Sequence, residues 1–288
     1  MPELPEVETI VRSLRNPVGY PYSPNQTNDR SPGVVGRMIS GAQVNWPRSL
    51  AAPDLPSFNM RISGQSIRQV ERRGKFLVFS LDRDAMLIHL RMSGIIRVEP
   101  QDSAFDQPHD RIILNFQDGM RMVFNDTRKF GRLWLLENPM LVLKELGPEP
   151  LGTDLNEALF YSMLQEHRTA IKSLLLNQRF VAGLGNIYSD EALHLAGIHP
   201  LQKANTLSPH KAGELLQAIR ITLEEGIRKN GTSIDWIYRG GDFQNNLRVY
   251  QRPGQPCAVC GTLIERITLE QRGAHFCPHC QPLQPSKL

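Results

Sequence analysis

Apolar residues recur with a helical period near the start of the chain, directly after Pro5. They fall at i, i+3, i+4 and i+7, which places them on one face of a helix: Val7, Ile10, Val11 and Leu14. Pro5 suits the first helical turn because the amide groups there lack intrahelical partners, and Glu6 suits the positive end of the helix dipole. The pattern therefore predicts an amphipathic helix at the N-terminus.

Short apolar runs typical of β-strands follow between about residues 37 and 137. The clearest of these runs are residues 75–79, 85–90, 112–116 and 120–124. The last two flank Asp118-Gly119, a strong signal for a tight hairpin turn. Several strands at this spacing favour a β-sandwich or barrel. Residues 19–36 are rich in Pro, Asn, Ser and Gly, so we expect a surface loop there.

The pattern changes to helical after Gly147-Pro148-Glu149-Pro150, which we interpret as a domain boundary. Asn186 is expected to cap a helix that ends before Gly197, and Ser208-Pro209 to open a longer helix that Gly231 ends. The predicted fold class is α+β, with an N-terminal β-sandwich, a helical region and a cysteine-rich end. The corresponding domains are residues 1–146, 147–249 and 250–288.

Composition narrows the class of protein only a little. The chain has 288 residues, of which 40% are hydrophobic, and a formal net charge of +4. This charge permits a polyanionic partner without requiring one. No apolar run approaches the roughly 20 residues that span a bilayer, and the acidic N-terminus does not resemble a secretory signal. All four cysteines lie in the last 32 residues, which favours a reducing, cytoplasmic setting over a disulfide framework.

The cysteines form two C-x-x-C pairs separated by 16 residues: Cys257 and Cys260, then Cys277 and Cys280. Two thiolate pairs on two tight turns offer four soft ligands in a tetrahedron, the arrangement of a structural Zn²⁺ site. His275 and His279 are alternative ligands, but four cysteines already fill the coordination shell. We therefore predict one structural zinc ion with no open position for chemistry. Such ribbons often bind nucleic acid, although the arginines between the pairs also fit an ordinary solvated surface.

The N-terminus offers a candidate nucleophile. A small residue after Met1 normally allows the methionine to be removed, which exposes Pro2 as a free secondary amine. An α-amine has a pKa near about 7.7–8.0, so a useful fraction is unprotonated at neutral pH. Its attack on an aldehyde-like carbon gives a cationic iminium, and Glu3 and Glu6 lie within one turn to move protons. Most Met-Pro starts are nevertheless inert, so this pattern alone does not establish a catalyst.

Longer motifs, in order along the chain, give the sequence its resemblance to the formamidopyrimidine-DNA glycosylase family. They occupy residues 1–9, 73–77, 89–94, 125–131, 146–151, 169–172, 181–188, 196–200 and the cysteine ribbon up to residue 281. The resemblance implies a β-sandwich with a catalytic N-terminal helix, then a helix–two-turn–helix domain that ends in a zinc ribbon. It also implies base-excision repair of oxidised purines, 8-oxoguanine and formamidopyrimidines, in duplex DNA.

The family chemistry assigns roles to four residues of this chain. Pro2 is the amine that attacks C1′ of the everted nucleotide and displaces the damaged base, and Glu3 is the proton donor or shuttle. Lys75 matches the lysine that assists elimination and contacts phosphate. Arg272 matches the ribbon arginine that grips the phosphates around the lesion. The resemblance thus implies a bifunctional glycosylase and AP lyase that performs β- and then δ-elimination.

The same resemblance implies contacts with double-stranded DNA that contains a damaged base, held in the cleft between the two domains. Residues at matching positions approach the backbone or the lesion strand: His109, Arg128, Lys172 and Asn186. The space left by the everted base is filled by Met92, Arg128 and Phe130, because apolar wedges and an arginine can replace a stacked base. We expect the protein to act as a monomer.

Three departures from the family pattern bear on the function. The loop at residues 19–36 is longer than usual, Asp126-Thr127-Arg128-Lys129 replaces the commoner Asp-Pro-Arg-Arg, and the segment before Phe243 is shorter than the loop that covers an everted 8-oxoguanine. The last change leaves two alternatives open: a broader substrate range, or an endonuclease VIII-like enzyme for oxidised pyrimidines. The Leu4-Pro5 opening favours the formamidopyrimidine branch.

Two rival functions come from different classes of protein. One is a zinc-ribbon DNA-binding protein without catalysis, and the second is an N-terminal-proline tautomerase. The intact Pro2, Glu3 and Lys75 argue against the DNA-binding protein. The zinc ribbon argues against the tautomerase, which has no use for it.

Overall fold

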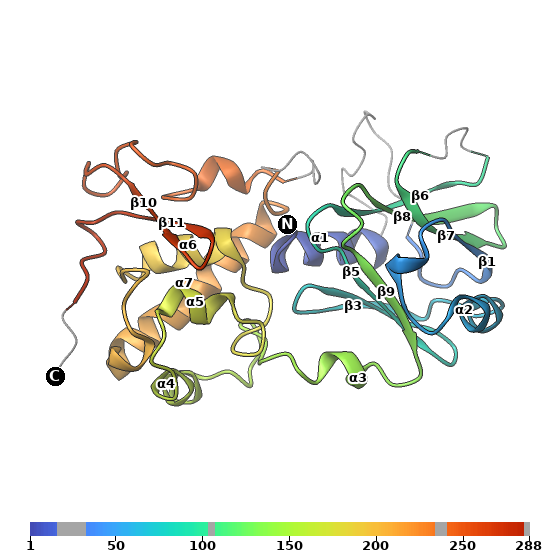
Figure 1. Cartoon of the computed structure of the whole chain (residues 1–288), viewed down its shortest axis with the longest axis horizontal. Coiled ribbons are helices and arrows are strands. Elements are labelled where there is room, and N and C mark those ends of the chain that lie inside the picture. Colours follow the sequence, from blue (N-terminus) through green and yellow to red (C-terminus); the bar gives the residue numbers. More distant parts are fainter. Residues whose placement is uncertain (16–32, 103–106, 234–240, 285–288) are drawn as a thin grey trace. The chain divides into compact units, whose positions relative to one another are not determined.

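The computed structural model describes residues 1–15, 33–102, 107–233 and 241–284. The chain divides into two compact units (Figure 1). The first contains Met1–Lys144 and Lys229–Asp242, and the second contains Glu145–Arg228 and Phe243–Leu288. Most of the predicted loop at residues 19–36 lies outside the described residues, as does most of the shortened segment at residues 238–242.

The predicted N-terminal helix is α1 (Leu4–Arg15), with Pro5 in its first turn. Its apolar stripe is buried, as the sequence pattern predicts, with exposed fractions of at most 8% for Val7, Ile10, Val11 and Leu14. These side chains join the hydrophobic core of the first unit. The burial of this stripe fixes the face of the helix that turns to the core, and with it the position of the residues just before the helix.

Two β-sheets build the rest of the first unit. One has the order β1-β7-β8-β6 and consists of β1 (Ile39–Val44), β6 (Gly94–Pro100), β7 (Asp110–Phe116) and β8 (Met120–Asp126). The other has the order β2-β9-β5-β4-β3 and consists of β2 (Leu50–Ala52), β3 (Gln69–Arg73), β4 (Phe76–Ser80), β5 (Ala85–His89) and β9 (Arg132–Leu136). Among the described residues of these two sheets, β2 pairs with β9 in parallel and the other strand pairs are antiparallel. The predicted hairpin is the β7–β8 turn, in which Gly119 has a φ of +81°.

A single core joins these two sheets. Phe79 and Ile88 of one sheet belong to the same buried cluster as Ile112 and Phe124 of the other. The short helix α2 (Leu55–Ile62) adds Phe58 and Ile62 to it. The remaining short helices of this unit are η1 (Pro47–Ser49) and α3 (Met140–Leu143). The β-sandwich predicted for the N-terminal part is therefore confirmed.

The second unit is helical and ends in a two-stranded ribbon. Its elements are α4 (Glu157–Gln165), α5 (Ile171–Leu176), α6 (Asn186–Leu195), η2 (Ala204–Thr206), α7 (Pro209–Arg228), η3 (Phe243–Asn246), β10 (Glu265–Leu269) and β11 (Arg272–Phe276). The predicted opening of the long helix at Ser208-Pro209 is confirmed, because the Lys211 amide donates to Ser208 Oγ at 3.2 Å. Within the described residues, no helix is both long and apolar enough to span a bilayer.

The start and end of α6 differ in how well the sequence predicts them. Gly197 has a φ of +64° directly after the helix, which confirms its predicted place at the C′ position. The prediction that Asn186 caps the helix is wrong. Asn186 is instead the first helical residue, and the cap position belongs to Gly185, which has no side chain with which to cap the helix.

The shared core yields a stability prediction. Phe79 in β4 is fully buried, so Phe79→Ala should lower the free energy of unfolding by about 3–5 kcal/mol. Met60 on α2 is 75% exposed, and Met60→Ala should change that free energy by less than about 0.5 kcal/mol. Urea unfolding of both variants measures the difference. Equal effects of the two substitutions would contradict the assignment of the core.

Candidate functional site

A buried carboxylate fixes the N-terminus before α1. Pro2 and Glu3 are both buried in the described structure. The Glu3 amide donates to Glu6 Oε2 at 2.8 Å, the reach-back by which a side chain in the first turn bonds an amide that the helix itself cannot. Glu6 Oε1 accepts from the Thr232 amide at 2.8 Å and from Thr232 Oγ1 at 3.2 Å. The Glu6 side chain therefore joins the residue that follows Pro2 to Thr232, which lies 226 positions after Glu6 in the chain.

Gly231 allows this close approach. A Cβ atom at this position would lie 2.6 Å from Glu6 Oε1, and the residue has a φ of +78°. Both facts favour glycine, because other residues rarely adopt this conformation and a methyl group would displace the carboxylate. The amide of Thr232 can therefore reach Glu6 only because residue 231 lacks a side chain.

Lys75 lies in the two-residue turn Gly74-Lys75 that joins β3 to β4, and its side chain is buried. Its charge acts on His89, the last residue of β5. Burial, together with the positive charges of Arg91 and Lys75, lowers the pKa of His89 to about 3. His89 Nδ1 accepts from the Arg91 amide at 3.0 Å, and Phe76 packs edge-on against the ring, with centroids 4.7 Å apart. His89 is therefore a neutral imidazole beside the predicted catalytic lysine.

The sequence pattern assigns no role to His89, although this residue opens one of the motifs that carry the family resemblance. Its place at the end of a strand in that motif is the one signal that could have singled it out. The contact with Phe76 and the influence of Lys75 depend on the pairing of β4 with β5, in which Phe76 faces His89.

Met92, Arg128 and Phe130 are exposed on two loops of the first unit. Met92 is 40% exposed on the β5–β6 loop and Phe130 is 48% exposed on the β8–β9 loop. The Arg128 guanidinium carbon lies 5.1 Å from the centroid of the Phe130 ring. His109 is exposed on the loop before β7. These four predicted DNA-contacting residues are thus all available to solvent.

Backbone strain marks the same three loops. Arg91, His109 and Lys129 have φ values of 55°, 85° and 63°. A residue with a side chain rarely adopts this conformation, and it persists only where surrounding contacts enforce it. Each strained residue either neighbours a predicted DNA contact or is one. The three loops are therefore held in shapes that their own sequences do not favour.

In the second unit, Arg272 is the first residue of β11 and is exposed. It follows a two-residue turn in which Glu270 and Gln271 both have positive φ values, 47° and 65°. This turn type matches the twist of paired antiparallel strands. The ribbon therefore presents Arg272 close to its tip.

Lys172 is placed differently from the other predicted DNA contacts, because its side chain is fully buried. Its ammonium lies 2.5 Å from Asp190 Oδ1 and donates to the carbonyl of Gly273 at 2.9 Å. Asp190 Oδ2 also accepts from the His275 amide at 3.1 Å and lies 3.0 Å from His275 Nδ1. Lys172 and Asp190 therefore tie α5 and α6 to the strand that starts at Arg272.

Asn186 is half-buried at the start of α6. Its Oδ1 atom is buried and has no hydrogen-bond partner in the described part of the chain. The side chain is thus not used as a cap and retains the capacity to bond a ligand.

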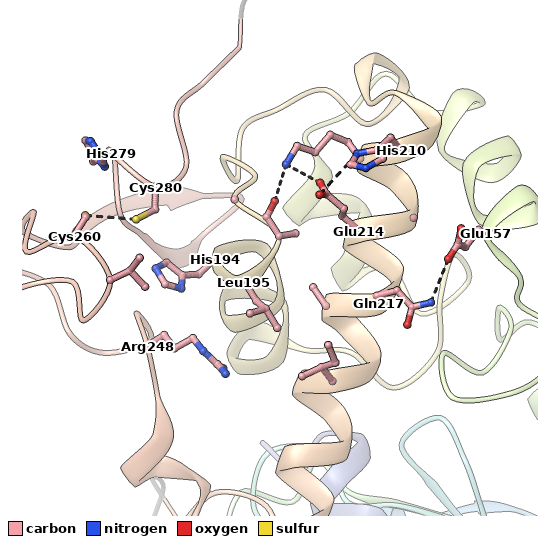
Figure 2. A pocket seen from close by; sticks show the side chains of 17 residues that line it. Glu157, His194, Leu195, His210, Glu214, Gln217, Arg248, Cys260, His279 and Cys280 are labelled. Carbon is pink, nitrogen blue, oxygen red and sulfur yellow. Dashed lines mark hydrogen bonds and ion pairs between the residues drawn. The ribbon is translucent and has the colours of Figure 1, made fainter.

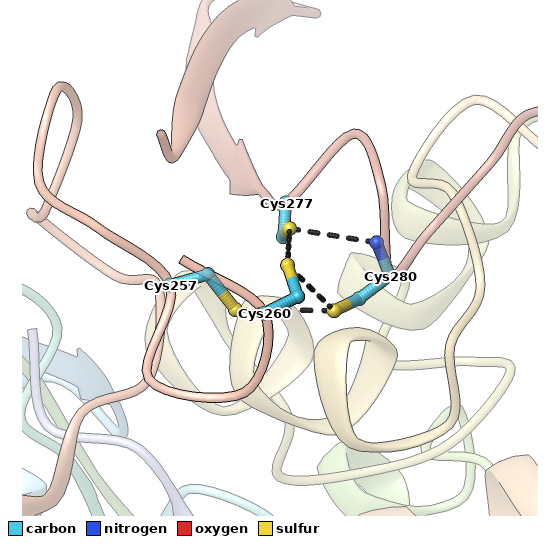
Figure 3. Close-up of side chains that lie close together, drawn as sticks. All are labelled: Cys257, Cys260, Cys277 and Cys280. Carbon is cyan, nitrogen blue, oxygen red and sulfur yellow. Dashed lines mark hydrogen bonds between the residues drawn. The ribbon is translucent and has the colours of Figure 1, made fainter. Parts of the chain in front are cut away.

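The four cysteines gather at one point of the second unit (Figure 3). Their Sγ atoms all lie within 4.8 Å of one another, and the Cys260 and Cys280 sulfurs are 3.4 Å apart. Four sulfurs at this separation fit the tetrahedral thiolate shell of Zn²⁺, whose Zn–S bonds measure about 2.3 Å. His275 is engaged by Asp190 instead. The second unit therefore contains a four-cysteine site suited to a structural metal ion.

A cavity of about 950 Å³ lies beside this four-cysteine site, between the C-terminal end of α6, the N-terminal half of α7 and the cysteine turns (Figure 2). Cys260 and Cys280 line it, together with His194 and Arg248. The four predicted catalytic residues, Pro2, Glu3, Lys75 and Arg272, are not among its lining residues. This cavity is thus separate from the chemistry that the sequence predicts.

Three segments of the chain match models of known protein domains. Residues 26–133 match the formamidopyrimidine-DNA glycosylase N-terminal domain, and residues 146–237 match the formamidopyrimidine-DNA glycosylase H2TH domain. Residues 254–283 match the zinc finger found in FPG and IleRS. These matches span the β-rich, helical and cysteine-rich parts in the predicted order.

Curated relatives match along the whole chain. The formamidopyrimidine-DNA glycosylase of Chloroflexus aggregans is 43% identical, and the match covers 98% of this chain and 99% of the relative. The enzyme of the same name from Enterococcus faecalis is 39% identical, with all of both chains covered.

Solved structures match as well. A variant of the Lactococcus lactis enzyme bound to DNA that contains Fapy-dG has a TM-score of 0.87 and 35% identity, and covers 98% of this chain and 100% of its own. The Lactococcus lactis enzyme with abasic-site DNA has a TM-score of 0.86 at 35% identity, with 97% and 99% of the two chains covered.

The low pKa of His89 predicts a pH dependence of stability. In the unfolded chain His89 binds a proton near its ordinary pKa of about 6.5, whereas in the folded chain it does so only near 3. Its contribution to stability is therefore complete above about pH 6.5 and is lost as the pH falls toward 3. The variant His89→Gln should show a shallower fall in unfolding free energy between pH 7 and pH 4, measured by urea titration. Parallel curves for the two proteins would exclude a neutral buried His89.

The cysteine site predicts a metal content. The purified protein should contain about one Zn²⁺ per chain by elemental analysis, and Cys277→Ser should lower that content and the melting temperature, because ribbon folding depends on the metal. His279→Ala is the matched control, since His279 neighbours the site but is not needed as a ligand. Loss of zinc from this control would show that the four-cysteine shell is wrong.

Proposed function

Because this chain belongs to the formamidopyrimidine-DNA glycosylase family, it is a base-excision repair DNA glycosylase for oxidised purines that also has AP lyase activity, and we propose that Pro2 is its nucleophile. The observation that carries the proposal is the fixed N-terminus. Glu6 bonds the Glu3 amide on one side and Thr232 on the other, so the residue before Glu3 is held at a defined place. Such positioning is what a covalent catalyst requires.

The chemistry follows from the amine. After removal of Met1, the Pro2 nitrogen attacks C1′ of the damaged nucleotide, a new N–C bond forms, and the bond to the base breaks. The base leaves with its electron pair and takes a proton, for which we propose Glu3 as the donor. Opening of the sugar gives an iminium on Pro2. This cation withdraws electrons from the adjacent C2′, which loses a proton as the 3′ phosphate departs.

We propose that Lys75 and Arg272 assist these eliminations. Lys75 supplies a positive charge beside His89. Because the lowered pKa of His89 keeps its imidazole neutral at neutral pH, His89 itself adds no positive charge at this place. Arg272, exposed near the tip of the ribbon, provides a guanidinium suited to bidentate contacts with phosphate. A second elimination would then leave a one-nucleotide gap with phosphate on both sides.

We further propose that Met92, Arg128 and Phe130 fill the space of the everted base, and that His109, Lys172 and Asn186 support the DNA strand. For Lys172 the burial of its ammonium supports an indirect contribution, through the carbonyl of Gly273 beside Arg272. One Zn²⁺ held by Cys257, Cys260, Cys277 and Cys280 would stabilise the ribbon rather than take part in bond breaking. The protein would act as a cytoplasmic monomer on duplex DNA, through a catalytic part at residues 1–146, a helical part at residues 147–249 and a ribbon at residues 250–288.

Borohydride trapping tests the role of Pro2. A duplex with 8-oxoguanine opposite cytosine, incubated with the protein and sodium borohydride, should give a covalent adduct on the N-terminal peptide by mass spectrometry. A variant with Pro2→Gly and one additional N-terminal residue should give no such adduct and no strand nicking, because the nitrogen of residue 2 is then an amide.

A protein with the additional residue at the C-terminus is the control and should behave as the wild type. An adduct mapped to Lys75 would overturn the assignment of Pro2. Excision restricted to oxidised pyrimidines would favour the endonuclease VIII-like alternative, and intact DNA in every reaction would leave only a DNA-binding protein.

A further inference from the structure

Two loops of the first unit converge on the buried carboxylate of Asp126 at the end of β8, and a third loop bonds the main chain of the same residue. The side chain is fully buried. The loops are the β5–β6 loop with Met92, the loop before β7 with His109, and the β8–β9 loop with Arg128 and Phe130. The exposed residues proposed to contact DNA in this unit thus surround a single acid that itself has no access to solvent.

Both oxygens of this carboxylate accept hydrogen bonds. Oδ1 accepts from Ser93 Oγ and, at 3.2 Å, from the Arg128 amide, while Oδ2 accepts from the Gly131 amide at 2.7 Å. Ser93 Oγ in turn accepts from the Arg128 amide at 3.0 Å. The β5–β6 and β8–β9 loops are therefore joined next to Met92 and on both sides of Phe130.

The main chain of Asp126 adds the third loop. Its amide donates to the carbonyl of His109 at 3.0 Å, and its carbonyl accepts from Arg111 Nε at 2.7 Å. Arg111 also lies 3.0 Å from His109 Nδ1. The position of the His109 loop thus depends on the same residue.

Packing beneath the loops prevents looser arrangements. The ring of Phe124 packs against the ends of the β5–β6 and β8–β9 loops. Cβ atoms added at Gly94 and Gly131 would lie 2.8 Å and 2.3 Å from this ring. Glycine at these two positions lets the loops approach each other closely enough to share one carboxylate. On its outer side the β8–β9 loop is held by Lys129, whose ammonium lies 4.1 Å from the ring centroid of Trp46.

A carboxylate suits this position better than an amide. Its two oxygens only accept, and Ser93 Oγ and the amides of Arg128 and Gly131 are all donors to it. An asparagine would offer one oxygen and one NH2 group. In either orientation of this side chain, the NH2 group would lie against an amide that needs an acceptor, either that of Gly131 or that of Arg128. The unpaired amide would then loosen one of the two loops.

We propose that Asp126 is a positioning residue that holds Met92, Arg128 and Phe130 as one rigid wedge for insertion into the base stack. This proposal rests on the proposed glycosylase function. A damaged base leaves a paired duplex at a cost of a few kcal/mol, and the wedge stabilises the everted state by filling the space. A loosened wedge must be ordered during insertion, so less of the DNA reaches the everted state.

The proposal predicts which step suffers. Asp126→Asn should slow single-turnover excision of 8-oxoguanine opposite cytosine by about tenfold, which corresponds to about 1.4 kcal/mol. It should leave cleavage and borohydride trapping at a preformed abasic site nearly unchanged, because no base has to leave the stack there. Excision should recover when the 8-oxoguanine lies opposite an abasic position, where base pairing no longer opposes eversion.

Two further variants sharpen the test. Ser93→Ala removes one donor to Asp126 and should produce the same pattern more weakly, and the double variant should lose less than the product of the two single effects, because Ser93 acts through Asp126. The matched control is Asp118→Asn, the same substitution at an exposed aspartate on the β7–β8 turn. This variant should behave as the wild type. If Asp126→Asn does not fold by circular dichroism, Ser93→Ala carries the comparison of the three substrates.

The outcomes separate the two proposals. Failure of the wild type to excise or to form the adduct would refute the proposed function. With an active wild type, equal losses on all three substrates, or no loss on any, would refute the positioning role of Asp126. Slowed excision at the paired lesion with unchanged abasic-site cleavage supports it.

Discussion

Glu6, Asp126 and Asp190 are buried carboxylates that accept backbone amides from segments outside their own helix or strand. Burial of a charged carboxylate is costly unless hydrogen bonds replace its hydration, so each acid requires its donors to stay in place. Glu6 holds the N-terminus, Asp126 the exposed loops and Asp190 the strand of Arg272. These three acids thus hold the N-terminus, the loops of the first unit and the strand β11, where most of the groups proposed to act on DNA lie.

Glu191 follows the same rule in the second unit. It is fully buried and accepts from the consecutive amides of Arg248, Val249 and Tyr250. Burial raises the pKa of its carboxyl group, while these three amides oppose that rise. Glu191 therefore fixes the segment that leads into the ribbon to α6. Its neighbour Asp190 fixes the strand β11 of the same ribbon to the same helix.

Local sequence patterns predicted many of the helices and turns. The features that they did not predict depend on contacts between residues far apart in the sequence. The period of Val7, Ile10 and Val11, and the Asp118-Gly119 turn, depend on neighbours in sequence and were predicted correctly. The family resemblance fixed the order of the domains. The burial of Lys172 was not predictable, because its partners Asp190 and Gly273 lie 18 and 101 residues away. The pairing of Glu6 with Thr232 spans 226 residues. Asn186 was wrongly expected to cap α6, since residue type alone does not reveal that Gly185 takes the cap position.

The Lys172–Asp190–His275 cluster has a consequence for how this sequence can diverge. Its members come from α5, α6 and β11, three stretches that are unrelated in local pattern. Loss of one charged side chain would leave its partner as an unpaired charge in the protein interior, which would lower the free energy of unfolding by about 3–5 kcal/mol. Mutational drift at any of these sites is therefore constrained by the other two, and tolerated replacements are expected to arrive as compensating sets. If a ribbon from another sequence replaced this one while α5 and α6 stayed unchanged, the new ribbon would have to restore the contacts with Lys172 and Asp190.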